Sequence, residues 1–277
     1  QGGVRKNSGC TETNNNNADF DVITAPVPRN SASPVFTCTA AAPALTITSL
    51  LATFSNVCIN TTTGPNTFTI SGSNLTTSDV TVGALAGYTY STSAGGTYTA
   101  SLTLTQPGGT FSQTVYVNFT PVAVQSYNGN IPVAGGGVST AVNAAATGAG
   151  INTAATVTSG AASSVTTGTA TVAGTVTATG CSALTGYGIE YSTTAGFPNG
   201  SGTAVASTNI SAGNFTSALT GLTASTVYYY HAYATNGGGT SYGAEQNFTT
   251  AAAVPALSAG TLAAFGNVCI NTTAGPS

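Results

Sequence analysis

Short runs in which apolar and polar residues alternate follow one another along most of the chain, with Gly, Pro, Asn and Ser between them. Alternation with a period of two places successive side chains on opposite faces of a β-strand. The clearest runs lie at residues 67–72, 80–85, 88–92, 98–105, 113–119, 129–136, 169–179, 187–193, 215–222 and 227–236. Short strands with turn residues at this spacing predict an all-β protein of tandem antiparallel β-sandwiches, without substantial helix.

An internal repeat sets the organisation of the chain. Residues 52–66 (ATFSNVCINTTTGPN) return at 263–277 (AAFGNVCINTTAGPS), identical at eleven of fifteen positions at an offset of 211 residues. A match at one fixed spacing indicates a tandem unit. We therefore expect the chain to be an excerpt of a longer protein, in which residues 251–277 are a linker and the first strand of the next repeat.

A change of composition near residues 148–154 divides the repeat into two predicted domains, at 39–152 and 153–250. Short segments containing Pro, at 39–48 and 251–260, read as linkers that lead into the two copies. Residues 1–38 form a separate N-terminal part.

Charge is scarce, and this excludes several classes of function. The 277 residues carry three basic and six acidic side chains and one histidine, and the basic residues Arg5, Lys6 and Arg29 all precede position 30. Nucleic acids and anionic membrane surfaces require clustered cations, and no apolar run approaches the roughly 20 residues that span a bilayer. Hydrophobic residues make up 41% of the chain, enough for packed cores.

The second predicted domain resembles a fibronectin type III domain of the kind found in secreted proteins of the Bacteroidetes, on residues 186–194, 219–243 and 246–250. The resemblance implies that Tyr228 is a corner tyrosine, hydrogen-bonded to the chain after Gly-Leu-Thr. Alternation places Tyr228, Tyr230, Ala232 and Ala234 on the inner face of the strand at 227–236. It places Tyr229, His231 and Tyr233 on the outer face.

The first predicted domain resembles the Ig-like class of bacterial choice-of-anchor and ASPM/SPD-2/hydin-like modules, on residues 68–82, 115–137 and 145–151. Residues 2–34 resemble the last strands of a bacterial lamin-tail domain. The Ig-like resemblance implies the role of a spacer or scaffold, because modules of this class are rarely catalysts.

Candidate chemistry centres on Glu190 and His231, which we expect to face outward on neighbouring strands. A cross-strand polar pair on a solvated sheet face is the ordinary interpretation. A nucleophile motif of the form G-x-S-x-G on a strand-to-helix turn is absent from the sequence, so we expect no enzyme and no cofactor. Together with Tyr229 and Tyr233, the pair forms a candidate ligand face. Tyr229 and Tyr233, with Tyr187 and Tyr242 nearby in sequence or sheet, form a candidate platform for stacking on a carbohydrate, and the alternative is that these tyrosines only cover the sheet.

Oxygen-bearing side chains gather near the N-terminus, where Glu12, Asp19 and Asp21 flank four consecutive Asn residues. Calcium prefers such ligands, although the spacing is not that of an EF-hand loop. The alternative is a turn in which the Asn side chains satisfy backbone groups.

The five cysteines, Cys10, Cys38, Cys58, Cys181 and Cys269, lack the spacing of a metal site and are compatible with an oxidising, extracellular setting. We predict a disulfide between Cys58 and Cys181. Cys58 is expected to end the first strand of the Ig-like domain, and Cys181 is expected to lie in the loop before the strand that contains Glu190. Cys269 would pair with a cysteine of the following unit, and Cys10 and Cys38 would pair with each other or with upstream residues. Buried free thiols are the alternative.

Together these features predict a stalk, fibre or adhesin-shaft segment of a large secreted cell-surface protein, with filament formation as one version. The expected partners are neighbouring repeats or subunits, with surface glycans as a further candidate. The C-terminal strand would complete either its own next domain or a neighbouring subunit. The alternative is a carbohydrate- or calcium-binding accessory module of a secreted enzyme.

Overall fold

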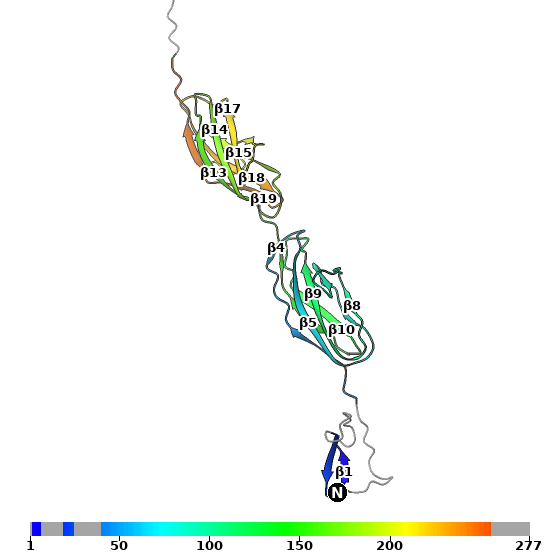
Figure 1. Cartoon of the computed structure of the whole chain (residues 1–277). Helices are drawn as coiled ribbons and strands as arrows, with labels where there is room; N and C mark the ends of the chain where they lie inside the picture. Colours follow the sequence, from blue (N-terminus) through cyan, green and yellow to red (C-terminus); the bar gives the residue numbers. More distant parts are fainter. Residues whose placement is uncertain (1, 7–18, 25–39, 256–277) are drawn as a thin grey trace, which may run out of the picture. The chain divides into compact units, whose positions relative to one another are not determined.

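The computed structural model describes residues 2–6, 19–24 and 40–255. The secondary-structure elements that lie wholly within these ranges are β-strands, β1 to β20 (Figure 1), which confirms the all-β prediction. The chain forms two compact units that divide between Ile151 and Asn152. We call residues 40–151 the first sandwich and residues 152–255 the second sandwich. Within the described residues, no helix is long and apolar enough to cross a membrane.

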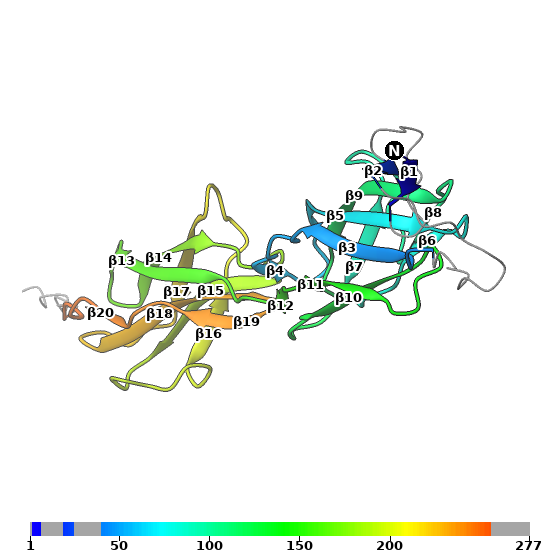
Figure 2. The same cartoon turned by 90° about the horizontal axis from the view of Figure 1, so that it is seen from below.

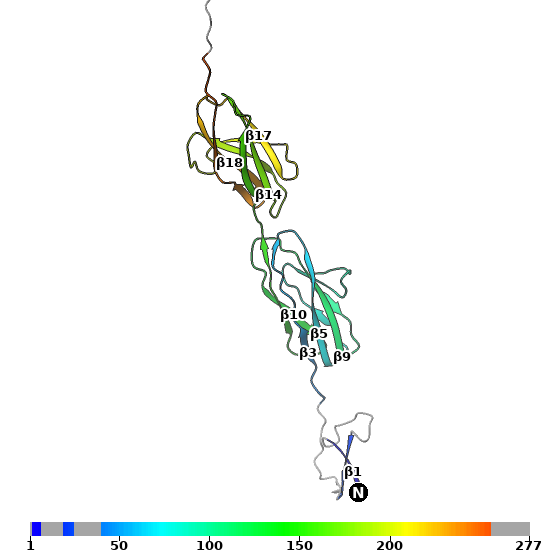
Figure 3. The same cartoon turned by 60° about the vertical axis from the view of Figure 1, so that its left-hand side comes forward.

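The first sandwich contains two four-stranded antiparallel sheets. One has the order β3 (Ala44–Ser49), β5 (Thr63–Leu75), β9 (Gly109–Phe119) and β7 (Tyr88–Ser91), and Figure 3 shows β3, β5 and β9 side by side. The other has the order β11 (Val142–Ala146), β10 (Gly129–Gly135), β6 (Val80–Val82) and β8 (Leu102–Leu104). A further pair, β4 (Asn56–Cys58) and β12 (Ala149–Ile151), is parallel.

An aromatic cluster lies in the core of the first sandwich. The ring of Phe119 stacks on Tyr88 with centroids 4.8 Å apart, and it also contacts Phe54 and Tyr127 at 5.6 and 5.4 Å. Phe119 is fully buried. Alternating inward residues of β5 and β9 belong to the same core, namely Phe68, Ile70, Val115 and Val117.

The second sandwich packs a three-stranded sheet against a larger one. The smaller sheet has the order β13 (Thr156–Ser163), β14 (Thr169–Ala178) and β17 (Asn214–Thr220). The larger has the order β16 (Thr203–Ala206), β15 (Gly186–Ser192), β18 (Val227–Asn236) and β19 (Gly239–Tyr242), and β20 (Gln246–Thr249) also pairs with β18. Figure 2 shows β13 and β14 in one layer and β18 and β19 in the other. This strand order is that of an Ig- or fibronectin type III-like β-sandwich.

The predicted inner face of β18 is confirmed. Tyr228, Tyr230, Ala232 and Ala234 are buried and belong to one core cluster with Ile189 of β15. The predicted corner tyrosine is also confirmed, because the Thr223 N–H donates a 2.9 Å hydrogen bond to Tyr228 Oη.

The first sandwich also has a corner tyrosine, Tyr127, which was not predicted from the sequence. There Tyr127 Oη accepts hydrogen bonds from the N–H groups of Val122 and Ala123, at 3.0 and 2.9 Å.

Two expectations about the first sandwich are wrong. Residues 39–48 are not all linker, because Ala44–Ser49 forms β3, which pairs with β5 and buries Leu45. Cys58 therefore does not end the first strand, but ends β4, opposite Ile151 of β12. The reason is that Ala and Pro at the start of this segment have the composition of a linker, whereas pairing with β5 makes it a strand.

The N-terminal part contributes the antiparallel pair β1 (Gly2–Arg5) and β2 (Phe20–Ile23). Most of the region that resembles a lamin-tail domain lies outside the described residues. The repeated segment at 263–277 also lies outside them.

Candidate functional site

Glu190 and His231 meet across neighbouring strands, as the sequence predicted. They are direct register partners on β15 and β18, and His231 Nε2 lies 2.8 Å from Glu190 Oε2. The expectation that this face is solvated is wrong, since only 2% of Glu190 and 3% of His231 is exposed. A buried acid–base pair therefore occupies the middle of the outer sheet face.

The loop of residues 193–202, between β15 and β16, covers this pair. Phe197 of the loop is buried and stacks on the His231 ring, with centroids 4.6 Å apart and an interplanar angle of 28°. The Glu190 carboxylate accepts hydrogen bonds from the N–H groups of Gly200 and Gly202, at 2.9 and 2.5 Å. The pair thus acts as an anchor for the loop.

Glu245 holds the same loop from a second side. Its two carboxylate oxygens lie 2.9 and 3.2 Å from the N–H of Gly196. Residues 40–255 contain only three acidic side chains, Asp79, Glu190 and Glu245. Two of the three are therefore used to fix one loop, which shows how specifically its conformation is determined.

The environment of Glu190 favours its ionised form. Burial by itself raises the pKa of the carboxyl group, but the hydrogen bonds from His231, Gly200 and Gly202 together outweigh it and hold the pKa below its ordinary value. Three donors occupy the two oxygens, and Phe197 and Tyr242 cover the His231 ring. In this geometry both Glu190 oxygens have donors, and the pair presents almost no surface.

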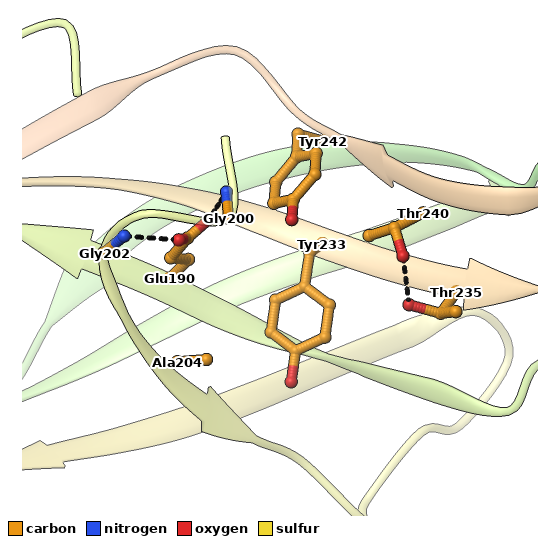
Figure 4. A pocket seen from close by; sticks show the side chains of 8 residues that line it. All are labelled: Glu190, Gly200, Gly202, Ala204, Tyr233, Thr235, Thr240 and Tyr242. Carbon is orange, nitrogen blue, oxygen red and sulfur yellow. Dashed lines mark hydrogen bonds between the residues drawn. The ribbon is translucent and has the colours of Figure 1, made fainter. Parts of the chain in front are cut away.

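A cleft of about 230 Å³ lies beside the anchored loop (Figure 4). The loop contributes Gly200 and Gly202 to its lining, and the sheet contributes Glu190, Ala204, Tyr233, Thr235, Thr240 and Tyr242. Tyr233 on β18 and Tyr242 on β19 are register partners, with ring centroids 6.4 Å apart at 44°. Burial, and then the negative charge of Glu190, raises the pKa of both phenols.

The predicted ligand face is brought together only in part. Tyr233 lines the cleft, whereas Tyr229 lies opposite Ser192 and Asn247 and is not among the lining residues. His231 and Glu190 lie beneath the loop and present almost no surface. Tyr187 packs on the core side against Phe215, with ring centroids 5.2 Å apart, so it cannot extend the outer face.

The alternation of the sequence does not predict the loop of residues 193–202. Phe197, Gly200, Gly202 and Glu245 determine its position, and none was a candidate. The signal that was present is the segment Gly196-Phe-Pro-Asn-Gly-Ser-Gly202, in which a single large apolar residue stands among turn residues. An apolar residue in such a context indicates a loop that packs back onto the sheet.

The calcium candidates are only partly described. Glu12 and the four Asn residues lie outside the described residues. Asp19 is buried, and Asp21 forms an exposed ion pair with Lys6, with a distance of 3.8 Å between Nζ and Oδ1. Within the described ranges no three His, Cys, Asp or Glu residues form a group that could hold a metal ion. Calcium binding remains a prediction.

Cys58 and Cys181 are both disulfide-bonded. Within its own sandwich, Cys58 lies opposite Ile151, and the Cys181 N–H donates a 3.1 Å hydrogen bond to the Thr153 carbonyl. Cys181 lies in the loop between β14 and β15, as expected. The pairing of these two cysteines with each other stays a prediction, and Cys10, Cys38 and Cys269 lie outside the described residues.

No family model matches the chain, and no curated protein matches it. Among solved structures, it is similar to the sensor domain of the anti-sigma factor RsgI4 from Pseudobacteroides cellulosolvens, at 20% identity over 36% of this chain and 96% of that chain, with a TM-score of 0.28. Chicken CNTN1 FN1–FN3 domains match at 15% identity over 73% of this chain and 66% of that chain, with a TM-score of 0.30.

A fibronectin type III domain of human KIAA0970 matches at 15% identity over 44% of this chain and 84% of that chain, with a TM-score of 0.25. TM-scores this low carry no argument about function. The Ig- or fibronectin type III-like assignment therefore rests on the strand order, and the lamin-tail and choice-of-anchor resemblances stay predictions.

Proposed function

We propose that this chain is a structural segment of a large extracellular surface protein, of the stalk, fibre or adhesin-shaft type. The observation that carries the proposal is the 211-residue repeat interval, which contains one complete second sandwich and nearly all of a first sandwich. Each sandwich has its own closed core cluster. Modules that each bury their own core can be joined in tandem without a shared core.

The polar chemistry of the described residues supports a mechanical role. Glu190, His231 and Glu245 hold a loop. On the outer face of the sheet of β3 and β5, hydroxyl groups bond to one another, as Ser49 Oγ donates to Thr69 Oγ1 at 3.1 Å and Thr48 and Ser71 lie 3.3 Å apart. Such a surface obtains its solubility from hydroxyl groups, whose protonation does not change over the ordinary pH range.

The disulfide-bonded state of Cys58 and Cys181 supports an extracellular location, since disulfides persist in oxidising compartments. A direct test is antibody labelling of the source cells with serum raised against the folded chain. We expect labelling of intact, unpermeabilised cells. Labelling that requires permeabilisation would contradict the proposal.

Association between copies follows from the same surface chemistry. Residues 40–255 contain no Lys or Arg, so none of the edge strands there has the positive charges that commonly block pairing with another chain. We expect concentration-dependent oligomers in sedimentation experiments, and weaker association when an exposed position of the edge strand β3 is charged, as in Thr46→Lys. The control is Thr175→Lys on β14, a position with register partners on both sides, Thr158 of β13 and Asn214 of β17. Equal association of both variants would argue against edge pairing.

A further inference from the structure

The cleft beside the loop of residues 193–202 has the features of a small binding site. Its volume of about 230 Å³ is below the roughly 300–1,000 Å³ typical of drug-sized ligands, so it suits a ligand of about one ring. Four of its lining side chains carry hydroxyl groups, namely Tyr233, Thr235, Thr240 and Tyr242. Figure 4 shows the two tyrosines projecting from neighbouring strands beside the Thr235–Thr240 pair.

The walls of the cleft are fixed before any ligand arrives. Glu190 holds Gly200 and Gly202 by their N–H groups, and this determines the position of the loop wall. The Tyr242 ring packs edge-on against His231 with centroids 4.8 Å apart. A Cβ atom at Gly188 would lie 3.0 Å from Tyr233 Oη and would clash with the Val205 carbonyl oxygen, so glycine leaves the room that this phenol occupies. A preformed site loses little conformational entropy on binding.

The hydroxyl groups of the cleft can both donate and accept hydrogen bonds. Thr235 Oγ1 and Thr240 Oγ1 lie 2.9 Å apart, and either can be the donor. Neither phenol hydroxyl is hydrogen-bonded to another residue in the described part of the chain. The raised pKa of Tyr233 and Tyr242 keeps both phenols protonated at neutral pH, so they remain donors.

The charge of the cleft discriminates between ligand classes. An anion is disfavoured, because the only charged lining group is the Glu190 carboxylate. An ammonium group needs a free acceptor, but the Glu190 oxygens are already occupied by His231, Gly200 and Gly202 and only 2% of the residue is exposed. A neutral ligand that carries several hydroxyl groups on an apolar ring frame matches both the hydroxyl groups and the aromatic rings of the lining.

We propose that this cleft binds one residue of a neutral saccharide, held by the hydroxyl groups of Tyr233, Thr235, Thr240 and Tyr242 and by the ring of Tyr242. The proposal is independent of the structural role proposed above. A shaft without this site and a sugar-binding module outside a shaft are both consistent with the fold.

The test is NMR titration of the full ¹⁵N-labelled chain with glucose, galactose, mannose and N-acetylglucosamine, and with choline and acetate as charged probes. At least one neutral sugar should give saturable shifts confined to the amides of Gly200, Gly202, Ala204 and Thr240. The variant Tyr233→Phe/Tyr242→Phe keeps both rings and should weaken this binding about five- to tenfold, because two hydrogen bonds are lost.

Tyr242→Ala should weaken sugar binding further, because it also removes the ring. The matched control is Tyr116→Phe, a half-buried tyrosine on β9 of the first sandwich, which should leave the affinity unchanged. Unshifted core amides, such as that of Ile189, establish that each variant is folded. Shifts only with choline, no neutral sugar that shifts the cleft amides, or equal affinity of the wild-type chain and both cleft variants would each overturn the proposal.

Discussion

The two sandwiches differ in whether they bury a charged group. In the first sandwich, Tyr88 Oη and Tyr90 Oη are buried without a hydrogen-bond partner, and Asp79, its only acidic residue, is exposed. In the second sandwich Asn152 Oδ1 is likewise buried without a partner. Here, however, a carboxylate and an imidazole are also buried, and the carboxylate has three donors. The difference reflects cost, because an unpaired neutral hydroxyl costs a few kcal/mol at most, whereas an unpaired buried charge costs far more.

The comparison also shows where specificity lies. Burial of Glu190 is tolerated because its partners come from two places, His231 on the adjacent strand and the amides of the covering loop. The charged group therefore selects one loop conformation, and the cleft forms beside that loop. The first sandwich has no such buried charge in residues 40–151, and its stability depends on apolar packing around Phe119.

Removal of the disulfide should have the largest effect. On the chain-entropy estimate, a bridge that closes the loop from Cys58 to Cys181 contributes about 4 to 5 kcal/mol. If the predicted pairing holds, Cys58→Ser and Cys181→Ser should lower the thermal midpoint equally, and each should leave one additional reactive thiol. Mass spectrometry of non-reduced peptic fragments should find the Cys58 and Cys181 peptides linked. A different partner for either cysteine would refute the pairing.

Phe119→Ala should destabilise the first sandwich by about 3 to 5 kcal/mol, because it removes the fully buried centre of the aromatic cluster. Denaturant unfolding followed by NMR should show the loss in amides of residues 40–151. Signals of the second sandwich serve as the internal control. A loss spread equally over both sandwiches would mean that they unfold as one cooperative unit.

Glu190→Ala should destabilise the second sandwich by about 3 to 5 kcal/mol, because it breaks a buried pair and leaves two loop amides without an acceptor. Glu245→Ala removes an exposed carboxylate from the same loop and should cost only about 0.5 to 1.5 kcal/mol. Chemical denaturation measures both. If the two variants lost equal stability, the buried pair would not be the principal anchor of the loop.

Low pH should also change the stability of the two sandwiches to different extents. The folded-state pKa of Glu190 lies below its ordinary value of 4.5, so its contribution to stability is present above about pH 4.5 and is lost as the pH falls through the folded-state pKa. The thermal midpoint of the second sandwich should therefore fall as the pH drops below 4.5. Glu190→Gln should remove this dependence. A dependence that persists in Glu190→Gln would assign it to another group.

The two corner tyrosines should have small effects on stability. Tyr127→Phe leaves two backbone N–H groups without an acceptor and should cost about 1 to 3 kcal/mol. Tyr228→Phe leaves one such group and should cost about 1 kcal/mol. Urea unfolding of each variant gives the comparison. A larger loss for Tyr228→Phe would show that the count of hydrogen bonds does not govern the contribution of these corners.

The features that the sequence predicts correctly are those that depend on residues close together along a strand. The alternation in residues 227–236 predicts the inner face of β18, and alternation places Glu190 and His231 on the outer faces of neighbouring strands, where the structure pairs them. The corner role of Tyr228 followed from a resemblance whose geometry spans only five residues. These features are local, or belong to one strand pair, and strand periodicity reports them directly.

The sequence by itself thus determined the all-β class, the two-faced strands and the outward positions of Glu190 and His231 on neighbouring strands. Only the tertiary structure decided that this pair is buried, that β4 runs parallel to β12, and that a cleft lies beside Tyr233 and Tyr242. The physical reason is that alternation states which way a side chain points, but not what covers it. The residues that cover a side chain often come from loops, such as the loop that contains Phe197, whose sequences have no hydrophobic periodicity. The positions of such loops depend on contacts with residues distant in the chain.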